Sequence, residues 1–118
     1  MKKILVVEDE SPIRNLYRDE LMDEGYEVIT APDGVIGYEM FKKNKPDLIT
    51  IDIKMPNMNG LELLDKIRKD DKNIPIIIYT AYGEFTQNFS TWAANEYLVK
   101  SSDLTEFKNK VRELLFKK

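Results

Sequence analysis

The sequence of 118 residues contains neither histidine nor cysteine. Without histidine, the chain cannot form a Ser-His-Asp triad, use a histidine as general base or bind zinc through imidazole. Without cysteine, it can form neither a disulfide nor a thiolate metal site, which suits a reducing compartment such as the cytoplasm. Any chemistry must therefore rest on carboxylates, lysines, hydroxyl groups and the backbone.

The chain also lacks an excess of positive charge and any long apolar run. Its formal net charge is −3 at pH 7, so no overall positive field favours nucleic acid or an anionic membrane. No apolar stretch approaches the roughly 20 residues of a membrane span. The first apolar stretch ends at the acidic residues 8–10, which predicts a strand and not a signal peptide. We therefore expect no direct binding of nucleic acid and no membrane contact.

The chain instead has a regular alternation of apolar strands and amphipathic helices. Its length, with 42% hydrophobic and 33% charged residues, fits one globular domain over residues 1–118. Short apolar runs at 3–7, 26–31, 47–52, 75–79 and 96–99 predict five strands. A helix is predicted after each strand, and the one at 84–95 is the least regular because Thr, Ser and Asn are modest helix formers. The alternation predicts an α/β fold with a doubly wound, five-stranded parallel sheet.

Local signals mark where three of these helices begin. Ser11 precedes Pro12, so we expect Ser11 to cap the first helix and Pro12 to lie in its first turn. The second helix opens at Asp33 and the third at Asn59, each of which is followed by a glycine.

Polar side chains stand where four of the five predicted strands end. Asp52 follows an apolar run and precedes a turn-forming segment, so taken alone it could equally be a turn residue, a helix cap or a site residue. Ligands bind open α/β sheets beyond the carboxyl ends of the strands, and those ends meet at one edge of a parallel sheet. The residues that we expect to converge there are Glu8, Asp9, Asp52, Thr80 and Lys100.

This set of residues predicts a metal and phosphoryl site. Three neighbouring carboxylates repel one another unless a cation lies between them. Hard oxygen ligands without histidine or cysteine suit Mg²⁺ or Mn²⁺. A carboxylate beside such a metal can act as a nucleophile and form an acyl phosphate. Lys100 and Thr80 can then contact phosphoryl oxygens.

The chain resembles, end to end, the receiver domain of two-component response regulators. The matching stretches are residues 6–10, 47–60, 79–81 and 97–100, in this order and at these spacings. The resemblance implies a flavodoxin-like sheet with the strand order 2-1-3-4-5 and five helices. It also implies a signalling switch, in which a partner histidine kinase or a phosphotransfer protein donates the phosphoryl group.

The resemblance further assigns a role to each site residue. Asp52 accepts the phosphoryl group, while Thr80 and Lys100 contact its oxygens. Asp9, Asp52 and the backbone carbonyl of Lys54 bind Mg²⁺, and Glu8 acts through water. Tyr97 is the switch aromatic that turns inward when Thr80 moves. The output face then consists of the predicted helix at 84–95, the strand at 96–99 and the last helix.

Three features depart from the family pattern. Ser101 follows Lys100 where the family usually has a proline with a cis bond, and we expect a trans bond here because non-proline cis bonds are costly. The segment 85–92 is rich in Phe and Trp instead of Ala and Glu, and its aromatic side chains belong either to the core or to an interface. Ala93 stands where glycine is common.

We also expect the bulky side chains of Lys54 and Tyr82 to slow the loss of the phosphoryl group from Asp52.

Several functions fit these residues. The first is a switch that promotes its own phosphorylation without being an enzyme for an external substrate. Such a switch would act on a downstream protein partner or on an attached output domain, and it could form a dimer on phosphorylation. It would be either a stand-alone regulator or the receiver part of a larger DNA-binding transcriptional regulator.

Three other functions fit less well. A Mg²⁺-dependent aspartyl-phosphate phosphatase would need a second acidic residue at the position of Lys54. A flavin module would need a phosphate-binding loop where residues 8–10 are acidic, and a constitutive interaction module would not need the intact site.

Overall fold

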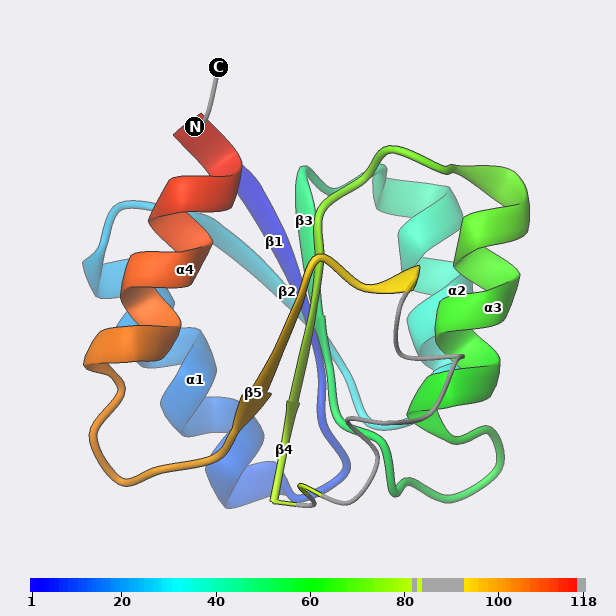
Figure 1. Ribbon diagram of the computed structural model, residues 1–118, viewed down its shortest axis with the longest axis horizontal. Helices are drawn as coiled ribbons and strands as arrows, with labels where there is room; N and C mark the ends of the chain where they lie inside the picture. Colours follow the sequence, from blue (N-terminus) through cyan, green and yellow to red (C-terminus); the bar gives the residue numbers. More distant parts are fainter. Residues whose placement is uncertain (82, 84–92, 117–118) are drawn as a thin grey trace.

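Five parallel strands form one sheet in the order β2-β1-β3-β4-β5 (Figure 1). The computed structural model describes residues 1–81, 83 and 93–116. The strands are β1 (Lys3–Val7), β2 (Glu27–Ala31), β3 (Leu48–Ile51), β4 (Ile76–Thr80) and β5 (Glu96–Val99). The predicted α/β class, the parallel sheet and the strand order are all confirmed.

Helices cover both faces of the sheet. The described helices are α1 (Ser11–Asp23), α2 (Gly34–Asn44), α3 (Gly60–Asp70) and α4 (Thr105–Phe116). Figure 1 shows α1 and α4 on one side of the sheet and α2 and α3 on the other. Most of the helix predicted at 84–95 lies outside the described residues, so the fifth helix stays a prediction. In the described part of the chain, no helix combines the length and apolar character needed to cross a membrane.

The helix starts follow the sequence signals with one exception. Asp33 and Asn59 are the N-cap residues of α2 and α3, and their side-chain oxygens accept the amide three residues further on, at 2.9 and 3.0 Å. The expected cap at Ser11 is wrong, because α1 begins at Ser11 and Glu10 stands at the cap position without a side-chain bond. Pro12, in the first turn, has no amide hydrogen and so leaves one donor fewer to satisfy.

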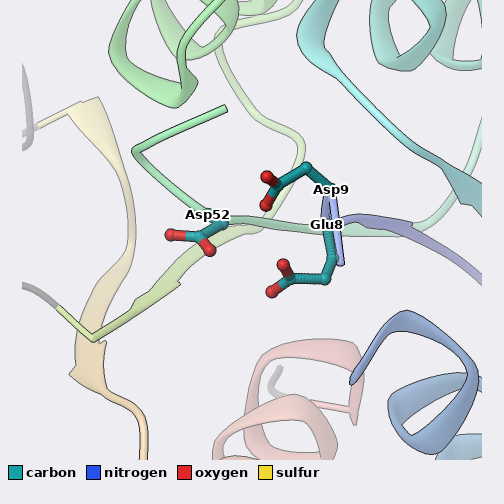
Figure 2. Close-up of side chains that lie close together, drawn as sticks. All are labelled: Glu8, Asp9 and Asp52. Carbon is teal, nitrogen blue, oxygen red and sulfur yellow. The ribbon is translucent and has the colours of Figure 1, made fainter. Parts of the chain in front are cut away.

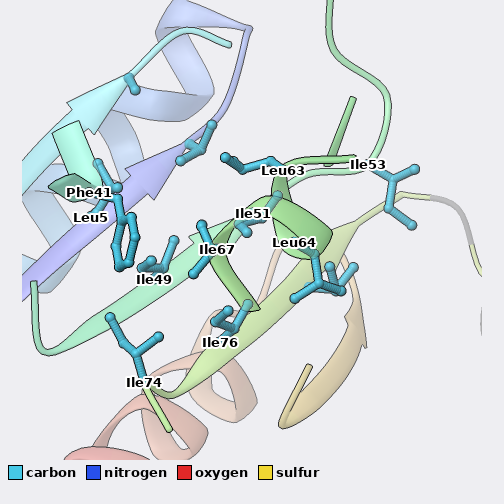
Figure 3. Packing of buried hydrophobic residues seen from close by; sticks show 13 residues of the cluster. Leu5, Phe41, Ile49, Ile51, Ile53, Leu63, Leu64, Ile67, Ile74 and Ile76 are labelled. Atoms are coloured by element: carbon cyan, nitrogen blue, oxygen red, sulfur yellow. The ribbon is translucent and has the colours of Figure 1, made fainter. Parts of the chain in front are cut away.

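The core on the α2 and α3 side is almost entirely aliphatic (Figure 3). Leu63, Leu64 and Ile67 of α3 pack on isoleucines of β3 and β4, and all are essentially excluded from solvent. Branched side chains of this kind pack well on a pleated surface. This layer holds β3 and β4, and therefore the ends of both strands, in a fixed position.

The core on the α1 and α4 side is built around three aromatic rings. Tyr79 of β4 stacks on Phe107 of α4 with 4.3 Å between the ring centroids and 3° between the planes. Tyr17 of α1 lies tilted against both rings, at 5.3 Å from Tyr79 and 5.6 Å from Phe107. Aromatic packing of this kind contributes beyond the area that it buries, and it joins both helices to β4.

Candidate functional site

The ends of β1 and β3 lie side by side because the hydrogen bonding of the sheet continues one residue past each strand. The amide of Glu8 donates to the carbonyl of Ala31, and the amide of Asp52 donates to the carbonyl of Val7, both at 3.1 Å. β1 lies between β2 and β3. Residues 8 and 52 are therefore delivered to neighbouring positions at the carboxyl edge, as the sequence predicts.

Three carboxylates gather at this edge (Figure 2). Oxygen atoms of Glu8, Asp9 and Asp52 all lie within 4.8 Å of one another. Glu8 and Asp52 are buried, with 2% and 6% of their surfaces exposed, whereas Asp9 is the more accessible of the three. Among the described residues, this donor set is entirely oxygen, and the chain has no histidine or cysteine to add to it. Such a set fits a hard divalent cation.

Strand alternation decides on which side of the sheet each site residue lies. Successive side chains of a strand point to opposite faces. Glu8 continues the face of Ile4 and Val6 toward α1 and α4, while Asp9 continues the face of Leu5 and Val7 toward α2 and α3, as Figure 2 shows. By the same alternation, Asp52 and Lys100 share the face of Glu8. Thr80 and Tyr97 share the face of Asp9.

Lys100 joins the two buried acids. Its ammonium group donates to Asp52 Oδ2 at 2.9 Å and to Glu8 Oε1. The same nitrogen lies 5.9 Å from the centre of the Tyr17 ring, at the top of the aromatic layer. Burial opposes the charge on Lys100, but its bonds to Glu8 and Asp52 outweigh burial and raise its pKa. Lys100 is therefore a firmly charged counter-ion for both carboxylates.

Glu8 has the most perturbed carboxyl group of the site. Burial raises its pKa to about 7, against the opposing effect of Lys100 and of the Glu10 amide, which donates to Glu8 Oε2 at 3.2 Å. The charge of Lys100, which lies beside this carboxyl group, therefore offsets part of the cost of burying it.

Short contacts of Asp52 and Ile53 fix the start of the turn that follows β3. Asp52 Oδ1 accepts the amide of Ile53 at 2.7 Å, which orients the carboxylate. The amide of Gly60 donates to the carbonyl of Ile53 at 2.7 Å. A Cβ atom on Gly60 would lie 2.0 Å from the carbonyl oxygen of Asp52, so only glycine fits there. Lys54 lies within the turn, exposed to solvent and two residues after Asp52.

One residue that supports the acidic turn is absent from the sequence prediction. Arg14, in the first turns of α1, donates from Nη1 to the carbonyl of Glu8 at 2.8 Å and to the carbonyl of Asp9 at 3.3 Å. It therefore holds the main chain that presents both carboxylates. No sequence pattern marks this contact, because the two groups that Arg14 binds are main-chain carbonyls.

The remaining predicted residues lie on β4 and β5. Thr80 is fully buried, and its carbonyl accepts the amide of Lys100 at 2.7 Å, which ties the two strand ends together. Tyr97 is half-buried, pairs with Ile78 in the sheet and packs against the aliphatic core. The peptide bond between Lys100 and Ser101 is trans, as expected. Tyr82 and the aromatic segment 85–92 lie outside the described residues, so the predictions for them stay predictions.

Comparison with known proteins agrees with this geometry. The model of the response regulator receiver domain family matches residues 4–112. Sporulation initiation phosphotransferase F of Bacillus subtilis is 35% identical over 116 residues, which cover 97% of this chain and 94% of that protein. The chain also matches probable transcriptional regulators that carry the name ycf27, but it spans only about half of their length.

Two solved structures of one protein are similar over nearly the whole chain. Response regulator protein TrrA of Thermotoga maritima, in complex with Mg²⁺ and BeF, superposes with a TM-score of 0.95 at 47% identity and covers 98% of this chain and 100% of that one. The complex of histidine kinase ThkA with TrrA contains a chain that matches with a TM-score of 0.91 at 47% identity, covering 98% and 99%. The protein with these strand ends and this acidic edge therefore belongs to the family of response regulator receiver domains.

Proposed function

We propose that residues 1–118 form a receiver domain that is switched by phosphorylation of Asp52, with a histidine kinase or a phosphotransfer protein as the donor. The observation that carries this proposal is the convergence of Glu8, Asp9, Asp52 and Lys100 at the carboxyl edge of the sheet. The kinase as partner is supported by the similar chain that is bound to a histidine kinase. In this role the domain would work in the cytoplasm.

The proposed cofactor is Mg²⁺, with Mn²⁺ as a chemical equivalent. Asp9, Asp52 and the backbone carbonyl of Lys54 would hold it, and Glu8 would act through water. The all-oxygen donor set supports this choice, and so does the similar structure that contains Mg²⁺ and BeF. The metal would neutralise negative charge on the carboxylates and on the incoming phosphoryl group.

In the proposed reaction, a carboxylate oxygen of Asp52 attacks phosphorus. An O–P bond forms as the N–P bond of the donor phosphohistidine breaks, and the imidazole nitrogen keeps the electron pair of that bond. Lys100, already 2.9 Å from Asp52 Oδ2, would pair with a phosphoryl oxygen. The Thr80 hydroxyl would donate to another, and Tyr97 would follow Thr80 as the switch residue. These 118 residues contain no histidine, so a phosphohistidine donor must lie outside them.

The proposed role is that of a switch and not that of an enzyme with an external substrate. The domain would promote only its own phosphorylation and dephosphorylation, although one relative carries the name of a phosphotransferase. Its output would go to a downstream protein or an attached output domain through the surface of β5, α4 and residues 84–95, with dimerisation on phosphorylation as one form. Relatives of similar length and relatives of about twice the length support both contexts.

Incubation with Mg²⁺ and acetyl phosphate tests the proposal. Intact mass analysis is expected to find one phosphoryl group, which peptide mapping places on Asp52, and EDTA is expected to prevent the modification. Asp65→Asn is the matched control, because Asp65 is an exposed aspartate on α3 with 74% of its side chain accessible. Absence of an adduct in the wild type, or an adduct that persists in Asp52→Asn, would contradict the proposal.

A further inference from the structure

The turn between β3 and α3 contains a strained residue outside the acidic cluster. Asn57 has a φ of 68°, in the left-handed region that asparagine tolerates better than most residues. The amide of Met58 donates to the carbonyl of Pro56 at 2.7 Å and closes a three-residue turn around Asn57. A turn with this φ and this bond is a γ-turn, which is rare and strained. Contacts elsewhere must therefore hold it.

One such contact is a hydrogen bond to the start of α2. Asn57 Nδ2 donates to Asp33 Oδ2 at 2.9 Å, across 24 residues of sequence. The other carboxylate oxygen of Asp33 accepts the amide of Ile36 and so caps α2. Asp33 is buried, with 7% of its surface exposed. One carboxylate therefore fastens the strained turn to a helix whose position the aliphatic core determines.

A second contact lies beside the first. A Cβ atom on Gly34 would be 2.4 Å from the carbonyl oxygen of Met58 and 2.8 Å from its Cβ. The first residue of α2 thus touches the main chain of the turn directly, and a larger side chain would push the turn away. The two contacts lie on consecutive residues of one segment, 33–34, and on consecutive residues of the other, 57–58.

We propose that Asp33 and Asn57 are positioning residues for the metal site, because they hold in place the turn that carries Lys54. The inference rests on the proposed function, in which the carbonyl of Lys54 is a metal ligand. On one side of Lys54 the chain is fixed by the bond between Ile53 and Gly60. On the other side it is fixed at Asn57. Lys54 thus lies between two anchored points of the main chain, and loss of the Asn57 contact removes one of them.

Three variants separate the hydrogen bond from its surroundings. Asn57→Gly removes the amide but keeps the left-handed backbone accessible. Asn57→Asp sets a second carboxylate against Asp33. The exchange variant Asp33→Asn/Asn57→Asp restores one donor and one acceptor, keeps the net charge, and leaves at position 33 a residue that caps helices well. Asn73→Asp, at an exposed loop residue between α3 and β4, is the control for added charge.

Two measurements are needed for each variant. The first is the Mg²⁺ dissociation constant, obtained from amide chemical shifts during titration. The second is hydrogen exchange of the Gly60 amide in EDTA, which requires no bound metal. Asn57→Gly is expected to weaken Mg²⁺ binding roughly fivefold, the size that the net loss of one hydrogen bond gives. Exchange at Gly60 is expected to accelerate in both single variants and to return to the wild-type rate in the exchange variant, whose Mg²⁺ affinity should be within about twofold of wild type.

The outcomes separate this inference from the proposed function. Wild-type protein that neither binds Mg²⁺ nor accepts a phosphoryl group overturns the proposed function. Wild-type protein that does both, combined with unchanged Mg²⁺ affinity in Asn57→Gly, overturns only the positioning role. An exchange variant that binds Mg²⁺ as weakly as Asn57→Gly would also overturn it, because a general loss of packing and not the hydrogen bond would then explain the effect.

Discussion

The two faces of the sheet pack different side chains and present different parts of the site. On the α1 and α4 side, stacked aromatic rings lie below Lys100, Glu8 and Asp52. On the α2 and α3 side, an aliphatic layer lies below Asp9, Thr80 and the turn after β3. The aromatic face thus supports the buried ion cluster, and the aliphatic face supports the accessible acid and the residues proposed to switch. The site therefore has two halves, and each half is supported by the core on its own face of the sheet.

Truncation of one core at a time would break this comparison most strongly. Phe107→Ala and Ile67→Ala each remove a fully buried side chain, one from each face, and are expected to cost about 4 and about 3 kcal/mol of unfolding free energy in urea titrations. If the halves are separate, amide shifts change mainly at Glu8 and Lys100 in the first variant and mainly at Thr80 and Asp9 in the second. Equal changes at all four positions would mean that the halves are one unit.

Gly60→Ala tests the point where the turn of the aliphatic side touches Asp52. The added methyl group would meet the carbonyl of Asp52 at 2.0 Å, and overpacking against main chain is expected to cost about 3 kcal/mol, measured by urea unfolding. Gly25→Ala is the control, since Gly25 has a φ of 94° but no neighbouring atom within 4 Å. It should cost only about 1 kcal/mol through its left-handed backbone. Similar losses in both variants would argue against crowding at Gly60.

Lys100→Met tests the ion cluster of the aromatic side. Removal of the ammonium leaves Glu8 and Asp52 facing each other with only 2% and 8% of their side chains exposed. The free energy of unfolding in EDTA is expected to fall by about 3 kcal/mol, because a buried charge has lost its partner. Mg²⁺ should recover part of that loss. Lys108→Met, which breaks the more exposed pair with Glu20, serves as the control and should have little effect.

The smallest effects are expected where the helices of each side meet. Tyr38 of α2 donates to Asp70 of α3. On the other side, Lys108 of α4 pairs with Glu20 of α1, and Arg112 of α4 pairs with Glu24, the residue that follows α1. Tyr38→Phe and Lys108→Met are each expected to lower Tm by about 2 °C at low salt. The effect of Lys108→Met should disappear in 1 M NaCl, because salt screens exposed charges, while that of Tyr38→Phe should remain. Equal salt dependence would show that both helix pairs are held in the same way.

The sequence predicted the fold and the strand ends because both depend on local patterns. Apolar runs and turn residues located the strands within a residue or two of their observed bounds, and parallel strands bring their ends to one edge. The gathering of Glu8, Asp9, Asp52 and Lys100 followed from that rule together with a strand order taken from the family resemblance. The cap expected at Ser11 was wrong because α1 begins one residue earlier, which makes Ser11 its first residue and Glu10 its cap.

The supporting contacts were not predicted, because two of them join distant segments and the third ends on main-chain carbonyls. Arg14 binds main-chain carbonyls, and a carbonyl has no side-chain signature. The bond between Asp33 and Asn57 links two turns that the chain order separates by a strand and a helix. The tight fit of Gly34 against Met58 depends on the distance between two backbones. Only the three-dimensional arrangement reveals such pairs.

The alternation of side chains along β1 has a consequence for how this protein can change over time. Ile4 and Val6 belong to one core, Leu5 and Val7 to the other, and Glu8 and Asp9 inherit those directions. Insertion or deletion of a single residue in β1 would turn both acids to the wrong sides or move apolar side chains of β1 into the opposite core. Substitutions can be absorbed one at a time, but a change in strand length cannot. Descendants of this chain should therefore vary in the residues of β1 long before they vary in its length.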